Sequence, residues 1–155
     1  MQDLIRDENA TARELISFRI SDQEFCVDIM SVREIRGWTQ ATPLPRTPNY
    51  VRGVINLRGA VLPVIDLGLR LGLQTDSPTD RHVIIVTRIE DQMIGLLVDA
   101  VCDIIAVTDS LIQATPDVSS DLVDRFIRGI FSLDGRMISL VALDRVLPDL
   151  EAEAA

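Results

Sequence analysis

The side chains that could perform chemistry in this sequence are few and widely separated. Four aspartates, Asp28, Asp66, Asp99 and Asp144, lie at the ends of apolar segments or in turns, far from one another along the chain. Acid–base catalysis requires paired groups in contrasting environments, which scattered carboxylates do not supply. The single histidine, His82, has no surrounding pattern that would make it a base. We therefore predict no catalytic residues, and interpret the aspartates as solvated or turn-forming.

Metal and phosphate sites have no better support. Cys26 and Cys102 form no CxxC pair, and His82 has no cysteine or histidine partner at ligand spacing. Gly68 and Gly72 are too loosely spaced for a dinucleotide-binding or Walker loop. We expect no metal and no cofactor, and we expect both cysteines to be small buried side chains in a reducing compartment.

Composition describes an ordinary globular protein with an acidic surface. The chain has 155 residues, of which 47% are apolar and 25% charged, and its net charge is −9. That charge argues against nucleic acid and against direct adhesion to anionic lipid. No apolar run approaches the roughly 20 residues of a spanning helix, and the N-terminus lacks a signal-peptide pattern. We expect a cytoplasmic location and no membrane insertion.

Short apolar segments separated by turns predict a mainly β fold. Alternating residues predict one hairpin from segments 15–20 and 25–29, and another from 54–57 and 61–67 around Arg58-Gly59. Segments 82–89, 93–98 and 137–143 are almost continuously apolar, which predicts strands buried on both faces. Helix is minor: Ser119 to Asp121 can cap a short helix that runs to Phe126.

An internal repeat is the most informative feature of the sequence. Residues 22–35 align without gaps on residues 91–104, and 52–59 align on 128–135 after a connection that is seven residues longer. Two related β-units, one in each half, are the simplest account, and a chance similarity of two amphipathic hairpins is the alternative. The polar segment 74–80 is the best candidate boundary between the halves.

Three segments of this chain closely resemble the CheW family of bacterial chemotaxis coupling proteins. They are 25–35 (FCVDIMSVREI), 52–59 (RGVINLRG) and 63–67 (PVIDL), and the likeness extends from about 14 to 147. The resemblance implies two five-stranded SH3-like β-barrels packed side by side, with subdomains of about 14–73 and 81–147. Whether the subdomains exchange strands is left open by the sequence. Residues 1–13 would be a flexible lead and 148–155 an acidic tail.

The resemblance also implies a function. Members of the family are non-enzymatic adaptors that couple the cytoplasmic tips of chemoreceptors to the regulatory domain of the histidine kinase CheA in chemosensory arrays. We expect a chain that is monomeric alone and is recruited to receptor arrays at the membrane. Open alternatives are a pathway that controls pilus motility or a second messenger, and a small ligand between the barrels held by Arg52, Arg58 and Arg128.

The resemblance places receptor- or kinase-binding residues in both halves. Val32 and Glu34, two apart, would share one strand face, and Gly53 would shape the backbone near Arg58. Arg58 would offer its forked guanidinium to a receptor carboxylate, although a plain hairpin turn is the alternative. Val101 and Ile104 are further expected contacts, in a groove that would bind the receptor helix. Burial in the core is the alternative for both residues.

A second kinase contact is expected in the longer connection of the second half. Gln113 and Val118 lie there, where some family members carry basic and aromatic residues instead. This departure weakens the expectation of a ring-closing interface for this chain.

Overall fold

The computed structural model describes residues 12–73, 75, 77–114 and 125–147. Strands dominate, and all the helices in this part of the chain are short. The strands are β1 (Ala12–Ile20), β2 (Gln23–Asp28), β3 (Val32–Gly37), β4 (Val51–Leu57), β5 (Ala60–Asp66), β6 (Val83–Ile89), β7 (Gln92–Val98), β8 (Ala100–Thr108), β9 (Ile127–Leu133) and β10 (Arg136–Val141). The helices are η1 (Ile29–Ser31), α2 (Leu67–Arg70), η2 (Asp109–Leu111) and α4 (Leu143–Val146).

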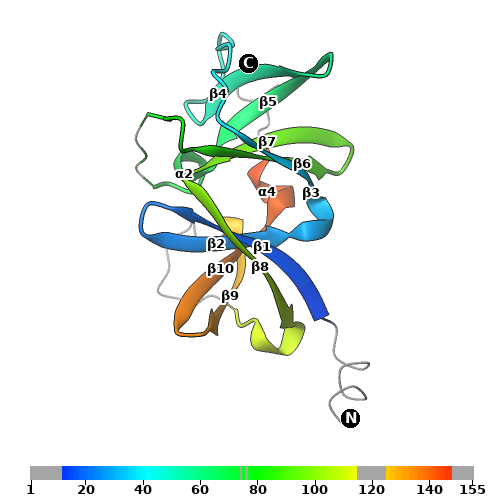
Figure 1. Cartoon of the computed structure of the whole chain (residues 1–155), viewed down its shortest axis with the longest axis vertical. Helices are drawn as coiled ribbons and strands as arrows, with labels where there is room; N and C mark the ends of the chain where they lie inside the picture. Colours follow the sequence, from blue (N-terminus) through cyan, green and yellow to red (C-terminus); the bar gives the residue numbers. More distant parts are fainter. Residues whose placement is uncertain (1–11, 74, 76, 115–124, 148–155) are drawn as a thin grey trace.

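The strands form two five-stranded sheets, which confirms the predicted fold class. Sheet one has the order β8-β1-β2-β10-β9, and sheet two has the order β3-β6-β7-β5-β4. Figure 1 shows sheet two in the upper part of the molecule and sheet one in the lower part. Both predicted hairpins are present, as β1–β2 and β4–β5.

The predicted subdomain boundaries, 14–73 and 81–147, do not match the sheets. Sheet two consists of residues 32–98, whereas sheet one combines the first two strands of the chain with the last three. The polar segment at 74–80 therefore falls between two strands of the same sheet, β5 and β6, and the chain changes sheets at η1 and at Asp99. The physical reason is that β1–β2 pairs with β8 and β10 from the other half instead of with β3.

The two sheets repeat the same strand order, which supports the duplicated unit. Replacing each strand of sheet one by its counterpart in the sequence repeat (β1 by β6, β2 by β7, β8 by β3, β9 by β4, β10 by β5) gives the order of sheet two. Each sheet also contains one parallel pair, β2 with β10 and β5 with β7. Strand exchange between equivalent hairpins thus builds both sheets.

Apolar side chains form three cores, and the largest lies between the sheets. On β6, Ile84 and Val86 join the interior cluster of sheet two, whereas Ile85 and Ile89 join the inter-sheet cluster. On β10, Ile138 belongs to the interior cluster of sheet one. Strand β6 is buried on both faces, as its continuous apolar character predicted, because one face fills a sheet interior and the other fills the interface. The same prediction is wrong for the start of β10, where Met137 is exposed.

Candidate functional site

Arg58 lies at the tip of the β4–β5 turn. The Asn56 side chain accepts a hydrogen bond from the Gly59 amide at 2.9 Å, and Arg58 itself has a φ of +52°. This local geometry is typical of a tight hairpin in which asparagine and glycine supply the turn. The Arg58 side chain is 71% exposed, so its guanidinium stands clear of the sheet.

Glu34 forms an ion pair with Arg58 that links the two edges of sheet two. Glu34 is on edge strand β3, and Arg58 follows edge strand β4. Arg36 adds a longer contact to the same carboxylate, at 3.4 Å. The hydrogen bond from Arg58 lowers the pKa of Glu34, and Glu34 in turn raises the pKa of Arg58. Stabilisation from this pair is therefore present above the ordinary carboxyl pKa and is lost as the pH falls through the lowered value.

Val32 and Glu34 do not share a strand face, contrary to the prediction. Val32 pairs with Thr87, but Glu34 pairs with the adjacent Val86, so Arg33 is an extra residue in a β-bulge. Val32 consequently packs against the inter-sheet cluster, whereas Glu34 turns toward Arg58. The two residues belong to different surfaces of β3.

Gly53 allows the backbone of the β3–β4 connection to approach β4 closely. Thr42 and Val54 exchange two backbone hydrogen bonds, at 2.8 and 2.9 Å, beside this glycine. A Cβ at position 53 would lie 2.2 Å from the Thr42 carbonyl oxygen. Gly53 therefore shapes the strand that leads to Arg58, and does not itself offer a side chain to a partner.

Val101 and Ile104 lie on β8, an edge strand of sheet one. Val101 is half-buried and packs against the inter-sheet cluster, while Ile104 is 63% exposed. They pair with Phe18 and Ile16, which occupy one face of β1. The core alternative is therefore wrong for Ile104, and the structure leaves it available to a partner.

Sequence reasoning missed the counterpart of Ile104 in the other half. Ile35 aligns with Ile104 in the repeat, lies on edge strand β3 and is 45% exposed. The repeat alignment could have found it, because residues at equivalent positions of duplicated units occupy equivalent places in the two sheets. Met30 in η1, at 77% exposure, is a second exposed apolar side chain that the sequence did not single out.

Gln113 is held against the edge of β9. Its backbone exchanges hydrogen bonds of 2.9 and 2.8 Å with Ile130, as Thr42 does with Val54 in the other half. Val118 lies outside the described residues. Of the two residues expected in a second kinase contact, the structure therefore describes only Gln113.

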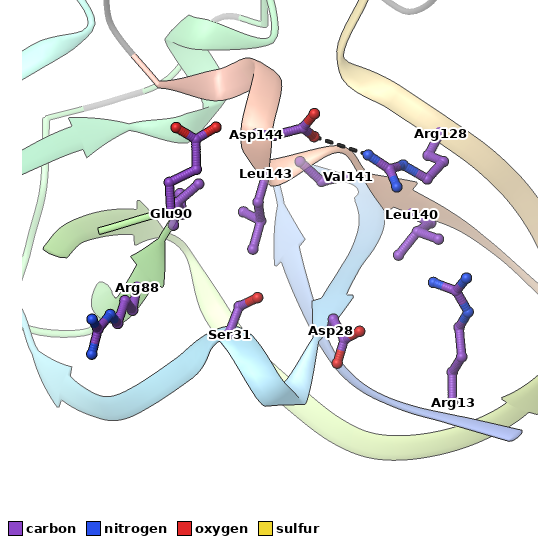
Figure 2. Close-up of a pocket in the computed structure, with 11 residues that line it drawn as sticks. Arg13, Asp28, Ser31, Arg88, Glu90, Arg128, Leu140, Val141, Leu143 and Asp144 are labelled. Atoms are coloured by element: carbon purple, nitrogen blue, oxygen red, sulfur yellow. Dashed lines mark hydrogen bonds and ion pairs between the residues drawn. The ribbon is translucent and has the colours of Figure 1, made fainter. Parts of the chain in front are cut away.

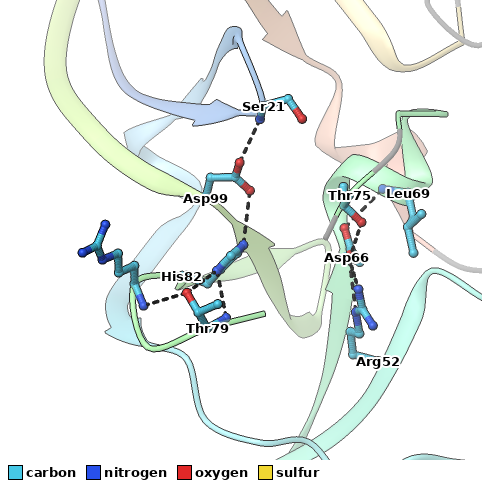
Figure 3. Close-up of polar contacts among 9 residues, drawn as sticks. Ser21, Arg52, Asp66, Leu69, Thr75, Thr79, His82 and Asp99 are labelled. Carbon is cyan, nitrogen blue, oxygen red and sulfur yellow. Dashed lines mark hydrogen bonds and ion pairs between the residues drawn. The ribbon is translucent and has the colours of Figure 1, made fainter. Parts of the chain in front are cut away.

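Asp66 is buried in a network that stabilises one end of sheet two. Its carboxylate accepts hydrogen bonds from Arg52 at 2.6 and 3.1 Å, from Thr75 at 3.1 Å and from the Leu69 amide at 3.2 Å (Figure 3). The last contact caps α2. The hydrogen bonds around Asp66 thus explain its burial by a structural role.

Asp99 connects the two sheets at the β7–β8 crossover. Its side chain accepts a hydrogen bond from the Ser21 amide at 2.8 Å and lies 3.5 Å from His82 Nε2 (Figure 3). His82 Nδ1 accepts the Thr79 amide at 3.0 Å, which leaves Nε2 as the protonated nitrogen of the neutral ring. Asp28 caps η1. All these contacts are structural. The interpretation of the aspartates as solvated or turn-forming is wrong for Asp66, which is buried and ion-paired with Arg52.

The cysteines differ from each other, and the prediction that both are buried is wrong for one. Cys26 is buried inside sheet one, but Cys102 is exposed because it lies at the irregularity where β8 pairs with β1. Burial, with a smaller contribution from Glu24, raises the pKa of Cys26 to about 12. The pKa of Cys102 is raised in the same direction. Within the described residues, no group of three or more His, Cys, Asp or Glu side chains is placed to hold a metal ion.

We expect only Cys102 to react with a disulfide reagent in the folded protein. Because its pKa is raised, Cys102 should react more slowly than a free thiol. Cys26 should be unreactive because it is buried and its pKa is raised to about 12. Thiol titration should give one equivalent in native protein and two in denaturant. Two equivalents without denaturant would contradict the placement of Cys26.

A cavity of about 410 Å³ lies where β1, η1, β6, β10 and α4 meet (Figure 2). Three arginines line it, but each has a carboxylate partner: Arg128 bonds Asp144 at 2.9 Å, Arg13 pairs with Asp109, and Arg88 lies 3.5 Å from Asp91. The lining also includes three carboxylates, those of Asp28, Glu90 and Asp144. The cavity therefore has no surplus of positive charge with which to bind a phosphate.

The set of three arginines expected to hold a small ligand is not assembled. Arg52 is bonded to Asp66 and Arg58 to Glu34, and only Arg128 lines the cavity between the sheets. The small-ligand alternative is not favoured.

Comparison with known proteins decides the family. The model of the CheW-like domain family matches residues 14–151. The chain belongs to the CheW family. Among CheW relatives, it is 59% identical over 151 residues to the probable chemotaxis protein CheW of Rhizobium etli, covering 97% of each chain. It is 61% identical over 143 residues to the chemotaxis protein CheW of Rhizobium meliloti, covering 92% of each.

A solved CheW structure has the same fold. The scaffolding protein TtCheW from Thermoanaerobacter tengcongensis superimposes with a TM-score of 0.81 at 31% sequence identity, over 88% of this chain and 92% of that one. CheW proteins form a family of non-enzymatic chemotaxis scaffolds. No helix in the part of the chain that the structure describes has the length and apolar character needed to cross a membrane.

Proposed function

We propose that this chain couples the cytoplasmic tips of chemoreceptors to a CheA-type histidine kinase, and that it performs no catalysis itself. The observation that carries the proposal is the exposure of apolar and charged side chains on the edge strands of both sheets. Ile35 and Ile104 are exposed at equivalent positions, and Arg58 projects from the adjoining hairpin. Single exposed aliphatic side chains are common on protein surfaces, so the support for protein partners comes from their recurrence at equivalent edge-strand positions of the two sheets.

The two kinds of surface suit two kinds of contact. Apolar side chains on β3 and β8 suit the apolar face of a receptor helix, which is a known mode of helix recognition. The Arg58–Glu34 pair lies at an edge of sheet two and adds charge to a contact with a receptor or kinase. Recruitment to receptor arrays at the membrane would follow from these contacts and not from an anchor in the described chain. The chemotaxis relatives named above favour this pathway over pilus or second-messenger control.

Arg58→Ala and Glu34→Ala should each weaken receptor-coupled kinase activation, by about tenfold or more in the concentration needed for half-maximal activity. Both residues are exposed or half-exposed, so the far-UV circular dichroism spectrum should not change. Kinase activity in arrays reconstituted from receptor, kinase and this chain provides the measurement. If both variants activate the kinase as wild type does, the site assignment is wrong.

A charge-exchanged variant separates direct contact from internal support. Glu34→Arg combined with Arg58→Glu keeps an ion pair between the edges of sheet two but reverses the charge offered to a partner. Full recovery of coupling would assign the pair to holding the hairpin in place, and no recovery would assign Arg58 to the partner contact. Co-elution of the wild-type chain with the kinase regulatory domain tests the proposed function as a whole.

A further inference from the structure

A notch of about 430 Å³ lies between the β1–β2 turn and the start of β10. Strands β2 and β10 run parallel here, and their pairing begins at Glu24 and Ile138. Asp22 and Gln23 line one side of the notch, and Arg136 and Met137 line the other. It lies in sheet one, away from the Arg58–Glu34 pair of sheet two, and none of the structural roles described above accounts for it.

Glu24 is buried in this notch with an incomplete set of hydrogen bonds. Its side chain is 7% exposed, and no donor among the described residues makes a hydrogen bond to its Oε2 atom. The nearest cation is Arg136, whose Nη1 lies 3.3 Å away but donates its hydrogen bond to Asp103 at 3.2 Å. Two carboxylates thus share one guanidinium, and Arg136 Nε is also left without a partner.

The charge balance of the notch is negative. Three carboxylates, those of Asp22, Glu24 and Asp103, stand against the two guanidinium groups of Arg19 and Arg136. A buried carboxylate without its full set of donors costs free energy, and a cation from outside would recover part of that cost. The raised pKa values of both cysteines, to which Glu24 contributes after burial, agree with a negative field in this region.

The rim of the notch suits the stem of a long cationic side chain. Met137 is 58% exposed beside the charged groups, and Ile130 is half-buried next to it. Arginine places an aliphatic stem along apolar surface while its charged head bonds a carboxylate through a fork of donors. An apolar rim next to a recessed carboxylate matches that shape.

We propose that this notch binds an arginine side chain presented by a partner protein, with the guanidinium on Glu24 and the stem on Met137. The proposal rests on the function proposed above in one respect, that the ligand belongs to a protein partner. In the absence of the partner, Arg136 lies against Glu24 and offers it charge without a hydrogen bond. Because the Glu24 Oε2 atom is itself buried, the partner's guanidinium has to displace Arg136 to reach it.

Methionine-methyl NMR tests the notch directly. The protein labelled with ¹³C at its methionine methyl groups would be titrated with N-acetylarginine methylamide, and with the neutral N-acetylnorleucine methylamide as the control ligand. We expect a saturable shift of the Met137 resonance with the arginine probe alone. Met30 and Met93 are also exposed and serve as internal references that should not move.

Two variants should shift the probe affinity in opposite directions. Glu24→Gln keeps the shape of the side chain and should weaken binding about tenfold or more, whereas Arg136→Gln removes the internal competitor and should tighten it several-fold. Glu14→Gln, on an exposed part of β1, is the matched control and should bind as wild type does. If Glu24 and Arg136 had only a structural role, Arg136→Gln would not bind the arginine probe more tightly than wild type does.

Three results would overturn the proposal: no shift of Met137, the same affinity in Glu24→Gln as in wild type, or an equal response to the norleucine compound. A chain that binds the arginine probe but fails to co-elute with the kinase domain would count against the proposed function and leave the notch standing. If the arginine probe does not bind but the chain co-elutes with the kinase domain, the notch proposal is wrong and the proposed function stands.

Discussion

Replacing Asp66 with alanine should lower the free energy of unfolding by about 3–5 kcal/mol, because removing one partner of a buried ion pair leaves the other charge uncompensated. Asp66 is 2% exposed, and its carboxylate accepts two hydrogen bonds from Arg52. The substitution also removes the cap of α2 at Leu69 and the partner of Thr75. These losses all occur at one end of sheet two.

The sequence repeat supplies the matched control. Arg128 is the counterpart of Arg52, but the position equivalent to Asp66 holds Ala142. Arg128 pairs with Asp144 instead, and the side chains of this pair are 54% and 52% exposed. Asp144→Ala should therefore cost at most about 1 kcal/mol, as is usual for exposed ion pairs. Urea unfolding followed by fluorescence of the single tryptophan, Trp38, which packs against the interior of sheet two, measures both variants. Equal losses for the two aspartates would show that burial does not decide the strength of these pairs.

Gly53→Ala should lower the free energy of unfolding by about 2–4 kcal/mol, since it combines backbone strain with overpacking. Gly53 has a φ of +138°, and its added Cβ would meet the Thr42 carbonyl oxygen at 2.2 Å and the Pro43 nitrogen at 2.9 Å. These atoms belong to backbone and cannot rotate away. Relief requires the 42–43 segment to leave β4, which breaks the Thr42–Val54 pair and displaces the strand that leads to Arg58.

Two other glycines separate the causes of this effect. Gly59 has a φ of +89° but no atom within 4 Å of the added Cβ, so Gly59→Ala should cost about 1 kcal/mol from strain alone. Gly129 corresponds to Gly53 in the repeat, but its closest obstacle is the flexible Ile112 side chain at 2.5 Å. Denaturant midpoints should fall most for Gly53, less for Gly129 and least for Gly59. A loss at Gly59 as large as at Gly53 would show that backbone strain alone accounts for the effect.

The local structure of hairpins β4–β5 and β1–β2 could be predicted from residue types. The turn at 56–59 follows from asparagine and glycine flanked by alternating apolar residues, and it places Arg58 at the tip whatever the rest of the fold does. Hairpin β1–β2 follows in the same way from segments 15–20 and 25–29. These features depend on contacts between residues close in the chain, for which sequence patterns are direct signals.

The details of β3 could not be predicted in this way. A strict alternation puts Val32 and Glu34 on one face, but the bulge at Arg33 separates them, and the bulge depends on how β3 fits against β6 from a distant part of the chain. Exposure of Ile104 was likewise undetermined by periodicity, because an apolar residue on an edge strand can face either a core or solvent.

The sequence by itself determined that this protein is a duplicated β fold of the CheW family, with a turn that presents Arg58. Only the tertiary structure decided which hairpin completes which sheet, that Glu34 is the partner of Arg58, and that Glu24 is buried with a free acceptor. The physical reason is that all three depend on pairing between segments far apart in the chain. Equivalent hairpins of a repeat have nearly the same local preferences, so the choice between them rests on the cores that form when both sheets pack together.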